Sequence, residues 1–414
     1  MPRRRKKPEA DREKRRMNMK RYYFITIVIS LLTLAFFGTV YSVWTPASTD
    51  AVMKVGFIYE NDETTPYTYN FVQGQKALER EFGDKVKVYT KSNVQESAIQ
   101  EPLQEMVKKG CRIIFTNSSS THVKELASDY PLVQFCQISN NNTALPYTPK
   151  NYHTFNGKIY QGRYVSGIAA GMKLRQLIDE GRISPREAVV GFVGAFPSAE
   201  VISGFTAFIL GVRSVAPEAV MKVRYTSSWS NYSKEKACAK TLIDEGCIVI
   251  SQHASTIGPA AACEEAAAKQ LVYHVGYNQS MIDTAPTTSL ISTRINWSYY
   301  IIGAVRAMFQ GKTVESAVDG DIHGRDVGAG FERGWVEMLD LNRSIAAEGT
   351  AEAMAKAVEE FKNGSLEVFC GDYLGVNAEN SADTYDLNQG YQENMNSSTP
   401  TFQYILQNVV LVEQ

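Results

Sequence analysis

The chain has 414 residues, of which 44% are apolar and 21% are charged, and its formal net charge is −1. This composition is typical of a globular protein, and the length is sufficient for two lobes with a large core. Because no strongly basic stretch runs through the folded part, the composition argues against a partner that is a nucleic acid.

The first segment is an exception to this balance. Residues 1–21 carry eleven Lys and Arg against three Asp and Glu, a local charge of +8, which leaves about −9 for the rest. Residues 22–44 are uncharged and mostly apolar, with aromatic residues at both ends, and about 20 such residues span a bilayer. The positive-inside rule then predicts a basic cytoplasmic tail, a single-pass anchor through residues 22–44 and an extracytoplasmic remainder at the cell membrane.

A cleaved signal peptide is the alternative interpretation of the same segment, and it would make the protein secreted. A signal peptide has a shorter apolar region, and the small-residue cleavage sites near Ser42 and Ala47 are poor. No cysteine lies near the apolar run, which excludes a lipoprotein anchor. The sequence therefore favours the anchor.

The region that follows alternates apolar strands with helical segments. This alternation predicts an α/β lobe over residues 52–157. Strands are expected near residues 54–59, 86–89, 113–116, 132–138 and 152–155.

The pattern then repeats. Residues 189–217 give an apolar strand, a loop with Gly and Pro, and an amphipathic helix, as residues 52–82 did. Residues 107–120 and 243–256 each place Gly-Cys before an apolar strand that ends in small polar residues. Any α/β protein is loosely repetitive, but this matched pattern favours two Rossmann-like lobes with parallel sheets around a ligand cleft.

The second lobe is expected over residues 158–289, and residues from about 290 to 414 are expected to return to the first. A helix over 158–177 carries Gly167 and Gly171 on one face, which predicts the close approach of another backbone. The later expectations are a strand and helix over 290–311, a hairpin in 324–340, a helix over 345–363, an exposed loop over 379–398 and a final strand in 402–412.

The six cysteines show no metal-binding spacing, and no cofactor is predicted. Cys111 and Cys247 begin equivalent strands and are expected to be buried. A disulfide between Cys238 and Cys263 is an open but less favoured alternative.

Catalytic motifs are also missing from the sequence. The five histidines are scattered, and neither GxSxG nor a phosphate-binding GxxxxGK[ST] occurs. The chain is therefore not expected to be an enzyme.

Binding is better supported, because neutral hydrogen-bonding groups and aromatic rings follow the predicted strands. Such a lining suits a small polar ring system, which stacks on aromatic faces while amides and carboxylates hold its edge. The candidates are Asn61, Asp62, Tyr67, Asn117, Ser118, Asn156, Phe196, Trp229, His253 and Asn278.

Several longer stretches carry a resemblance to a known family. These include PYTYNFVQGQKALEREFGDKV, FNGKIYQGRYVSGIAAG, VGFVGAFPSAEVISGFTAFILGVRSVAPEA and HVGYNQSM. From Val52 to about Gly311 the chain resembles the BMP family, the purine nucleoside receptors of ABC transporters. The resemblance implies a type I periplasmic-binding fold, no catalysis and a purine held between the lobes.

The resemblance also assigns roles to residues. It implies that Tyr67 and Trp229 sandwich the base, that Asp62 (with Asn61 beside it) is the acidic loop residue, and that Asn156 is the asparagine at the crossover.

The sequence also departs from the family. Asn278 stands where the family has Asp, and Arg294 lies one position from the place of the ribose-contacting Lys. The family's lipoprotein cysteine is missing, and residues after Gly311 match only loosely.

The predicted function is capture of a purine nucleoside or nucleobase for an ABC importer, with permease and ATPase subunits as partners. A membrane-anchored sensor of the same fold, without transport, is the alternative. A nucleoside hydrolase is the third and least supported reading.

Overall fold

The computed structural model describes residues 16, 17, 19, 22, 52–138 and 147–412. The expected anchor over 22–44 lies, apart from Tyr22, outside these described residues. Among the residues described, no helix has both the length and the apolar character needed to cross a membrane. Contacts divide the chain between Ala51 and Val52, and the description below concerns the unit from Val52 onward.

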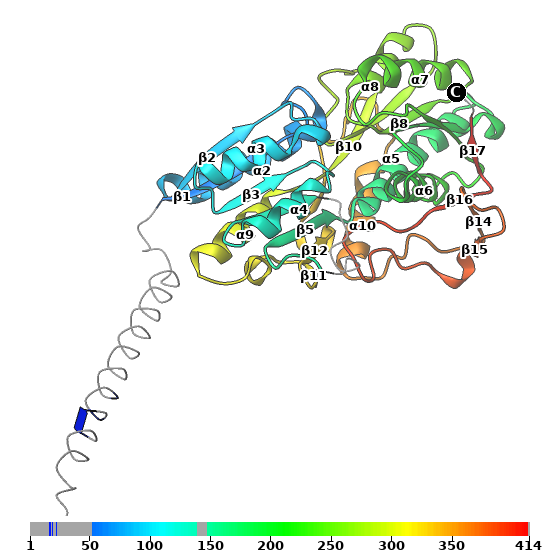
Figure 1. Ribbon diagram of the computed structural model, residues 1–414. Helices are drawn as coiled ribbons and strands as arrows, with labels where there is room; N and C mark the ends of the chain where they lie inside the picture. Colours follow the sequence, from blue (N-terminus) through cyan, green and yellow to red (C-terminus); the bar gives the residue numbers. More distant parts are fainter. Residues whose placement is uncertain (1–15, 18, 20–21, 23–51, 139–146, 413–414) are drawn as a thin grey trace, which may run out of the picture. The chain divides into compact units, whose positions relative to one another are not determined.

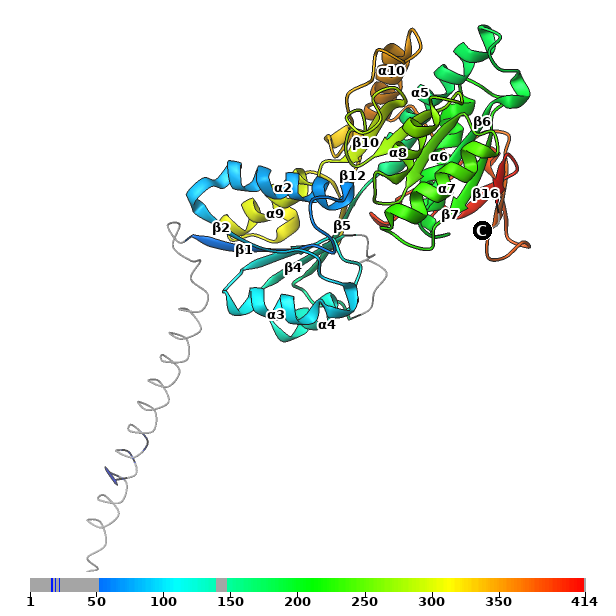
Figure 2. The same ribbon diagram turned by 90° about the horizontal axis from the view of Figure 1, so that it is seen from above.

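The first lobe is built on a seven-stranded sheet with the order β11-β12-β5-β4-β3-β1-β2. Its strands are parallel except β11, which pairs antiparallel with β12. Helices α2 and α9 cover one face of this sheet, and α3 and α4 cover the other (Figures 1 and 2). The elements are β1 (Met53–Ile58), α2 (Pro66–Phe82), β2 (Val86–Lys91), α3 (Gln100–Lys108), β3 (Ile113–Thr116), α4 (His122–Asp129), β4 (Gln134–Ile138), β5 (Tyr152–Gly157), α9 (Ser298–Phe309), β11 (Asp321–His323) and β12 (Asp326–Ala329).

The second lobe repeats this plan with a sheet of order β13-β10-β9-β8-β6-β7-β17. One face packs on α5 and α6 and the other on α7 and α8. Its elements are α5 (Ile159–Asp179), β6 (Val189–Gly194), α6 (Ala199–Arg213), β7 (Val220–Tyr225), α7 (Tyr232–Asp244), β8 (Val249–His253), α8 (Gly258–Ala266), β9 (Tyr273–Tyr277), β10 (Ser289–Ile295), β13 (Val336–Met338), α10 (Thr350–Lys362) and β17 (Val409–Leu411).

The expected close helix approach is present where α5 crosses α6. A Cβ on Gly167 would lie 2.1 Å from the Phe208 carbonyl oxygen, and one on Gly211 would lie 2.0 Å from the Tyr164 carbonyl oxygen. Both partners are backbone atoms that cannot rotate away. Glycine at these positions therefore permits the contact that builds the second-lobe core.

The last quarter of the chain differs from expectation. Residues 290–414 do not all return to the first lobe, because β10, β13 and β17 join the second sheet while only α9, β11 and β12 join the first. The hairpin expected in 324–340 is wrong for the same reason: β12 and β13 belong to different sheets, and the hairpin is β11–β12.

The expectation of an exposed loop over 379–398 is also partly wrong. A small sheet of β15 (Thr384–Asp386), β14 (Leu374–Asn377) and β16 (Tyr404–Leu406) frames this segment. Ser398 is buried, and its N–H and hydroxyl both donate to the Asp326 carboxylate on β12, at 2.6 Å each. Thr154 donates to the same carboxylate at 2.7 Å, so the C-terminal segment is tied to the first-lobe sheet.

The cysteines are all free thiols, so Cys238 and Cys263 form no disulfide with each other. Cys111 and Cys247 are buried at the starts of equivalent strands, as expected. Burial raises the pKa of the Cys111 thiol to about 11 and that of Cys247 to about 12, which keeps both neutral.

Candidate functional site

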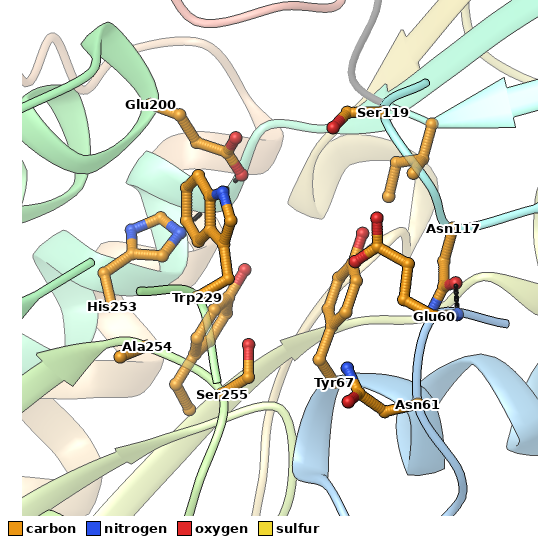
Figure 3. Close-up of a pocket in the computed structure, with 12 residues that line it drawn as sticks. Glu60, Asn61, Tyr67, Asn117, Ser119, Glu200, Trp229, His253, Ala254 and Ser255 are labelled. Carbon is orange, nitrogen blue, oxygen red and sulfur yellow. Dashed lines mark hydrogen bonds and ion pairs between the residues drawn. The ribbon is translucent and has the colours of Figure 1, made fainter. Parts of the chain in front are cut away.

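A pocket lies at the carboxyl ends of both parallel sheets, with residues of both lobes around a cavity of about 90 Å³. Figure 3 shows side chains reaching it from two sides, those near Tyr67 from the first lobe and those near Trp229 from the second. Its lining consists of Glu60, Asn61, Tyr67, Asn117, Ser119, Ile138, Glu200, Trp229, His253, Ala254, Ser255 and Tyr277.

The first-lobe wall follows from the ends of β1 and β3. Glu60 stands two residues after β1, and its backbone N–H donates to the Asn117 side-chain oxygen, 3.0 Å away. The Asn117 amide in turn donates to the Thr68 hydroxyl in α2 at 3.4 Å. Asn117 therefore joins the two strand ends to α2, whose first turn carries Tyr67 into the pocket.

The Glu60 carboxyl is the acidic group on this wall. Burial raises its pKa, and the nearby Glu96 charge adds to the rise. Hydrogen bonds from the Ser118 hydroxyl and the Ser119 backbone oppose the rise by stabilising the charged form. Glu60 is thus a partly desolvated acceptor facing the cavity.

The second-lobe wall is aromatic. Trp229, in the loop after β7, is 40% exposed and lies edge-to-face with Phe196 at 5.5 Å between ring centres. His253 ends β8 and Tyr277 ends β9, and their rings lie 4.9 Å apart. These contacts leave the Trp229 ring turned toward the cavity (Figure 3).

Glu200 is the acidic group of this second wall. It lies in the first turn of α6, where a negative charge is favoured by the helix dipole. Its carboxylate is 3.6 Å from Nε2 of His253. Burial, together with the Arg163 charge, lowers the pKa of His253, and the interaction with Glu200 opposes that effect.

Five of the predicted site residues line the pocket together: Asn61, Tyr67, Asn117, Trp229 and His253. Six others do not line it. Two of these six support the wall from behind, because Ser118 hydrogen-bonds to Glu60 and Phe196 packs on Trp229.

The remaining four have other contacts. The Asp62 carboxylate accepts hydrogen bonds from Thr64 in its own loop and from Asn93 in the loop after β2. Arg294 pairs with Glu337, with its Nη2 2.8 Å from the carboxylate, at the edge of the sheet.

Asn156 and Asn278 are both buried. The Asn156 side chain accepts from the Gly157 N–H, and Asn278 adopts a left-handed backbone with φ 69°.

Seven residues that line the pocket were not predicted from the sequence. Glu60 had a usable signal, since it precedes Asn61 at the same strand end. Glu200 and Tyr277 had a weaker one, at a helix start and a strand end. The others are Ser119, Ile138, Ala254 and Ser255.

Within the part of the chain that the structure describes, no group of three or more His, Cys, Asp or Glu is placed to hold a metal ion.

The chain was compared with known proteins. Residues 51–363 match the family model for PnrA-like ABC transporter substrate-binding proteins. A purine-binding protein of Brucella abortus (strain 2308) is 28% identical over 330 residues, which cover 78% of this chain and 85% of that protein. A candidate ABC transporter glucose-binding protein of Haloferax volcanii is 32% identical over 246 residues, which cover 59% of this chain and only 55% of that relative.

The fold has solved counterparts. An ABC transporter solute-binding protein of Aeropyrum pernix K1 superposes with a TM-score of 0.61 at 15% identity, over 76% of this chain and 92% of that one. The family match covers well over half of the chain and confirms the resemblance drawn from the sequence. The chain belongs to the PnrA-like family of ABC transporter substrate-binding proteins.

Proposed function

We propose that this protein captures a purine nucleoside or nucleobase between its two lobes and delivers it to an ABC permease. The observation that carries the proposal is the placement of Tyr67 and Trp229 in different lobes around one pocket. Two aromatic side chains on opposite walls suit a flat heterocycle, since each offers a stacking face.

The polar groups around these rings fit the edges of such a ligand. Glu60 and Glu200 carry acceptors suited to amino, ring N–H or ribose hydroxyl groups. Asn61 can both donate and accept, as a purine edge requires. The name of the Brucella relative supports the same ligand class.

Glucose is the ligand to weigh against a purine, because the name of the Haloferax relative includes it. A sugar also stacks on aromatic rings and bonds to carboxylates. Its ring is puckered rather than flat and carries more hydroxyl groups, however, which leaves less reason for an aromatic ring on each wall.

A thermal-shift screen tests the proposal. The panel contains adenosine, guanosine, inosine, the free bases, glucose and galactose. A ligand that binds only the folded state raises the unfolding midpoint, by the equivalent of about 2.7 kcal/mol at 100 times its Kd. A purine should produce the largest shift, and a shift with glucose alone would overturn the purine assignment.

We also propose that residues 22–44 anchor the protein, with the binding domain outside the cytoplasm. The support is the uncharged run after a tail of charge +8. N-terminal sequencing of the protein from cells tests this, because a mature chain beginning between residues 43 and 51 would mean a cleaved signal instead.

A further inference from the structure

Arg163 lies behind the second-lobe wall of the pocket without lining it. The side chain comes from α5 and is fully buried. Its Nη1 donates to the carbonyl oxygen of Gln252 at 2.7 Å. Its guanidinium carbon lies 3.9 Å from the centre of the Tyr277 ring, so the cation stacks on an aromatic ring that lines the pocket.

The contact with Gln252 reaches the rest of the wall. The Gln252 side chain donates to the carbonyls of Ala254 and Thr256, at 3.0 and 2.7 Å. The Ser255 N–H donates to the Trp229 carbonyl at 2.9 Å. The Arg163 guanidinium therefore contacts the Tyr277 ring directly. Through its hydrogen bond to the Gln252 carbonyl, it also holds the loop that contains His253, Ala254 and Ser255.

A purely structural role explains this arginine poorly. Among the described residues, no acceptor gives its Nε or Nη2 a well-formed hydrogen bond, although the Tyr277 side chain and the Glu200 charge both favour the charged form. Burial lowers its pKa to about 10, which still leaves it charged at neutral pH. A buried cation without a paired carboxylate is costly, and an apolar side chain of similar size often serves stability as well or better.

We propose that Arg163 is a positioning residue of the ligand site, which holds the Tyr277 ring and the loop 253–255 in place from behind. It sets ligand affinity without touching the ligand. This inference rests on the proposed function, because it assumes that the pocket binds the ligand.

The charge of Arg163 gives the role a specific signature at His253. The groups that face His253 are Arg163 from α5, Glu200 from α6, Tyr277 from β9 and Trp229 from the loop after β7. Arg163 favours the neutral imidazole, and Glu200 favours the protonated one. Burial, the larger cause of the lowered His253 pKa, remains when Arg163 is removed, but the repulsion from the guanidinium is lost, so His253 should take up a proton at a higher pH than in the wild type.

The test uses the full-length protein and two substitutions, Arg163→Met and Arg163→Lys. Methionine removes the charge and the hydrogen bond, whereas lysine keeps the charge but cannot stack flat on Tyr277. Arg213→Met is the matched control. Arg213 also comes from a second-lobe helix, donates to a backbone carbonyl (Ala219, 2.7 Å) and lies over a tyrosine ring (Tyr373, 5.5 Å), but it is not a pocket residue.

Affinity for adenosine, guanosine and inosine is measured by calorimetry between pH 5.5 and 8. We expect Arg163→Met to bind about tenfold more weakly or worse, since a hydrogen bond to a charged group is lost. Its affinity should also change more between pH 8 and 5.5 than that of the wild type or of Arg163→Lys, because its His253 is protonated at a higher pH. Its unfolding midpoint without ligand should fall no further than that of Arg213→Met.

Wild-type affinity in Arg163→Met, or a loss no larger than that of Arg213→Met, would overturn the proposal. If Arg163→Met does not fold, Arg163→Lys decides: reduced affinity with a flat pH profile supports the role, and wild-type affinity contradicts it. Failure of the proposed function is distinguishable, because the wild type itself would then bind neither the three nucleosides nor their free bases.

Discussion

The two lobes support their pocket loops in the same way but with different chemistry. In the first lobe, Gln137 on β4 donates to the carbonyls of Ser118 and Ser120 at 2.7 and 2.8 Å. The Tyr152 hydroxyl donates to the oxygen of the same glutamine at 2.7 Å. Every member of this support is neutral at physiological pH.

In the second lobe, Gln252 on β8 makes the equivalent pair of bonds, to Ala254 and Thr256. The group behind it is Nε2 of His274, 3.1 Å from the Gln252 oxygen, and Arg163 holds the Gln252 carbonyl. One scaffold therefore carries a neutral support in one half and a titratable, charged support in the other. Of these two supports, the one in the second lobe should be the one that responds to pH and charge.

The largest expected effect concerns helix packing. Gly211→Ala would force a Cβ against the Tyr164 backbone in the second lobe. A Cβ on Gly74 in the first lobe would lie 2.8 Å from Cδ1 of Ile301, the end of a side chain that can rotate, and 3.2 Å from Cβ of Trp297. We expect a loss of about 3 kcal/mol or more for Gly211→Ala and about 1 kcal/mol or less for Gly74→Ala in chemical denaturation. Equal losses of unfolding free energy in the two variants would contradict this difference between the two helix contacts.

The next prediction concerns the stability of the folded protein at low pH. Burial lowers the pKa of His274 to about 3 in the folded protein, against about 6.5 when unfolded. The unfolded state therefore binds the extra proton in this window, and stability falls as the pH drops from 6.5 toward 3. At pH 4.5 the wild type should have lost about 2.7 kcal/mol relative to His274→Gln, compared with their difference at pH 7.5. A stability difference between the two proteins that does not change with pH would contradict the lowered pKa of His274.

The third prediction tests whether both lobes share the ligand. Stacking on an aromatic ring is worth roughly 1–3 kcal/mol, so Trp229→Ala and Tyr67→Ala should each weaken purine binding by about five- to 150-fold. Trp229→Phe should lose less, and none of the three should change the unfolding midpoint greatly without ligand. Calorimetric titration measures this, and unchanged affinity in either alanine variant would remove that residue from the site.

The smallest expected effect is at the C-terminal tie between Ser398 and Asp326. Ser398→Ala removes one of the three hydrogen bonds described above to the buried Asp326 carboxylate, which should cost about 1 kcal/mol. Ser365→Ala is the control, because that hydroxyl is exposed and makes a long bond of 3.4 Å to the Glu360 carbonyl. Equal unfolding midpoints in the two variants would mean that the hydrogen bond from the Ser398 hydroxyl to Asp326 contributes nothing measurable to stability.

Local patterns in the sequence predicted the two-lobed plan and made Tyr67 and Trp229 binding candidates, while their pairing around a base was implied by the family resemblance. Tyr67 and Trp229 come shortly after apolar strands, and parallel strands end at one edge. The sequence could not predict which sheet β12, β13 and β17 each join, because short strands carry little sequence signal and their pairing depends on contacts distant in sequence.

Single residues behind the site were also beyond reach of sequence patterns. Arg163 stands in a helix that also carries exposed charges, so its burial against Tyr277 leaves no local mark. Glu60 was passed over in favour of Asp62, although only the structure distinguishes a carboxylate facing the cavity from one bound within its own loop.

Fluorescence tests the central claim, a purine held against Trp229, most directly. Trp297 and Trp335 are buried at 1% and 0% exposure, whereas Trp229 is 40% exposed, and Trp44 lies outside the described residues. Emission is followed during titration with guanosine, adenosine and inosine in the wild type and in Trp229→Phe. The account predicts a saturable change in the wild type that is absent from Trp229→Phe, even where calorimetry shows that the variant still binds. The same change in both proteins, or binding by the wild type without any change, would contradict it.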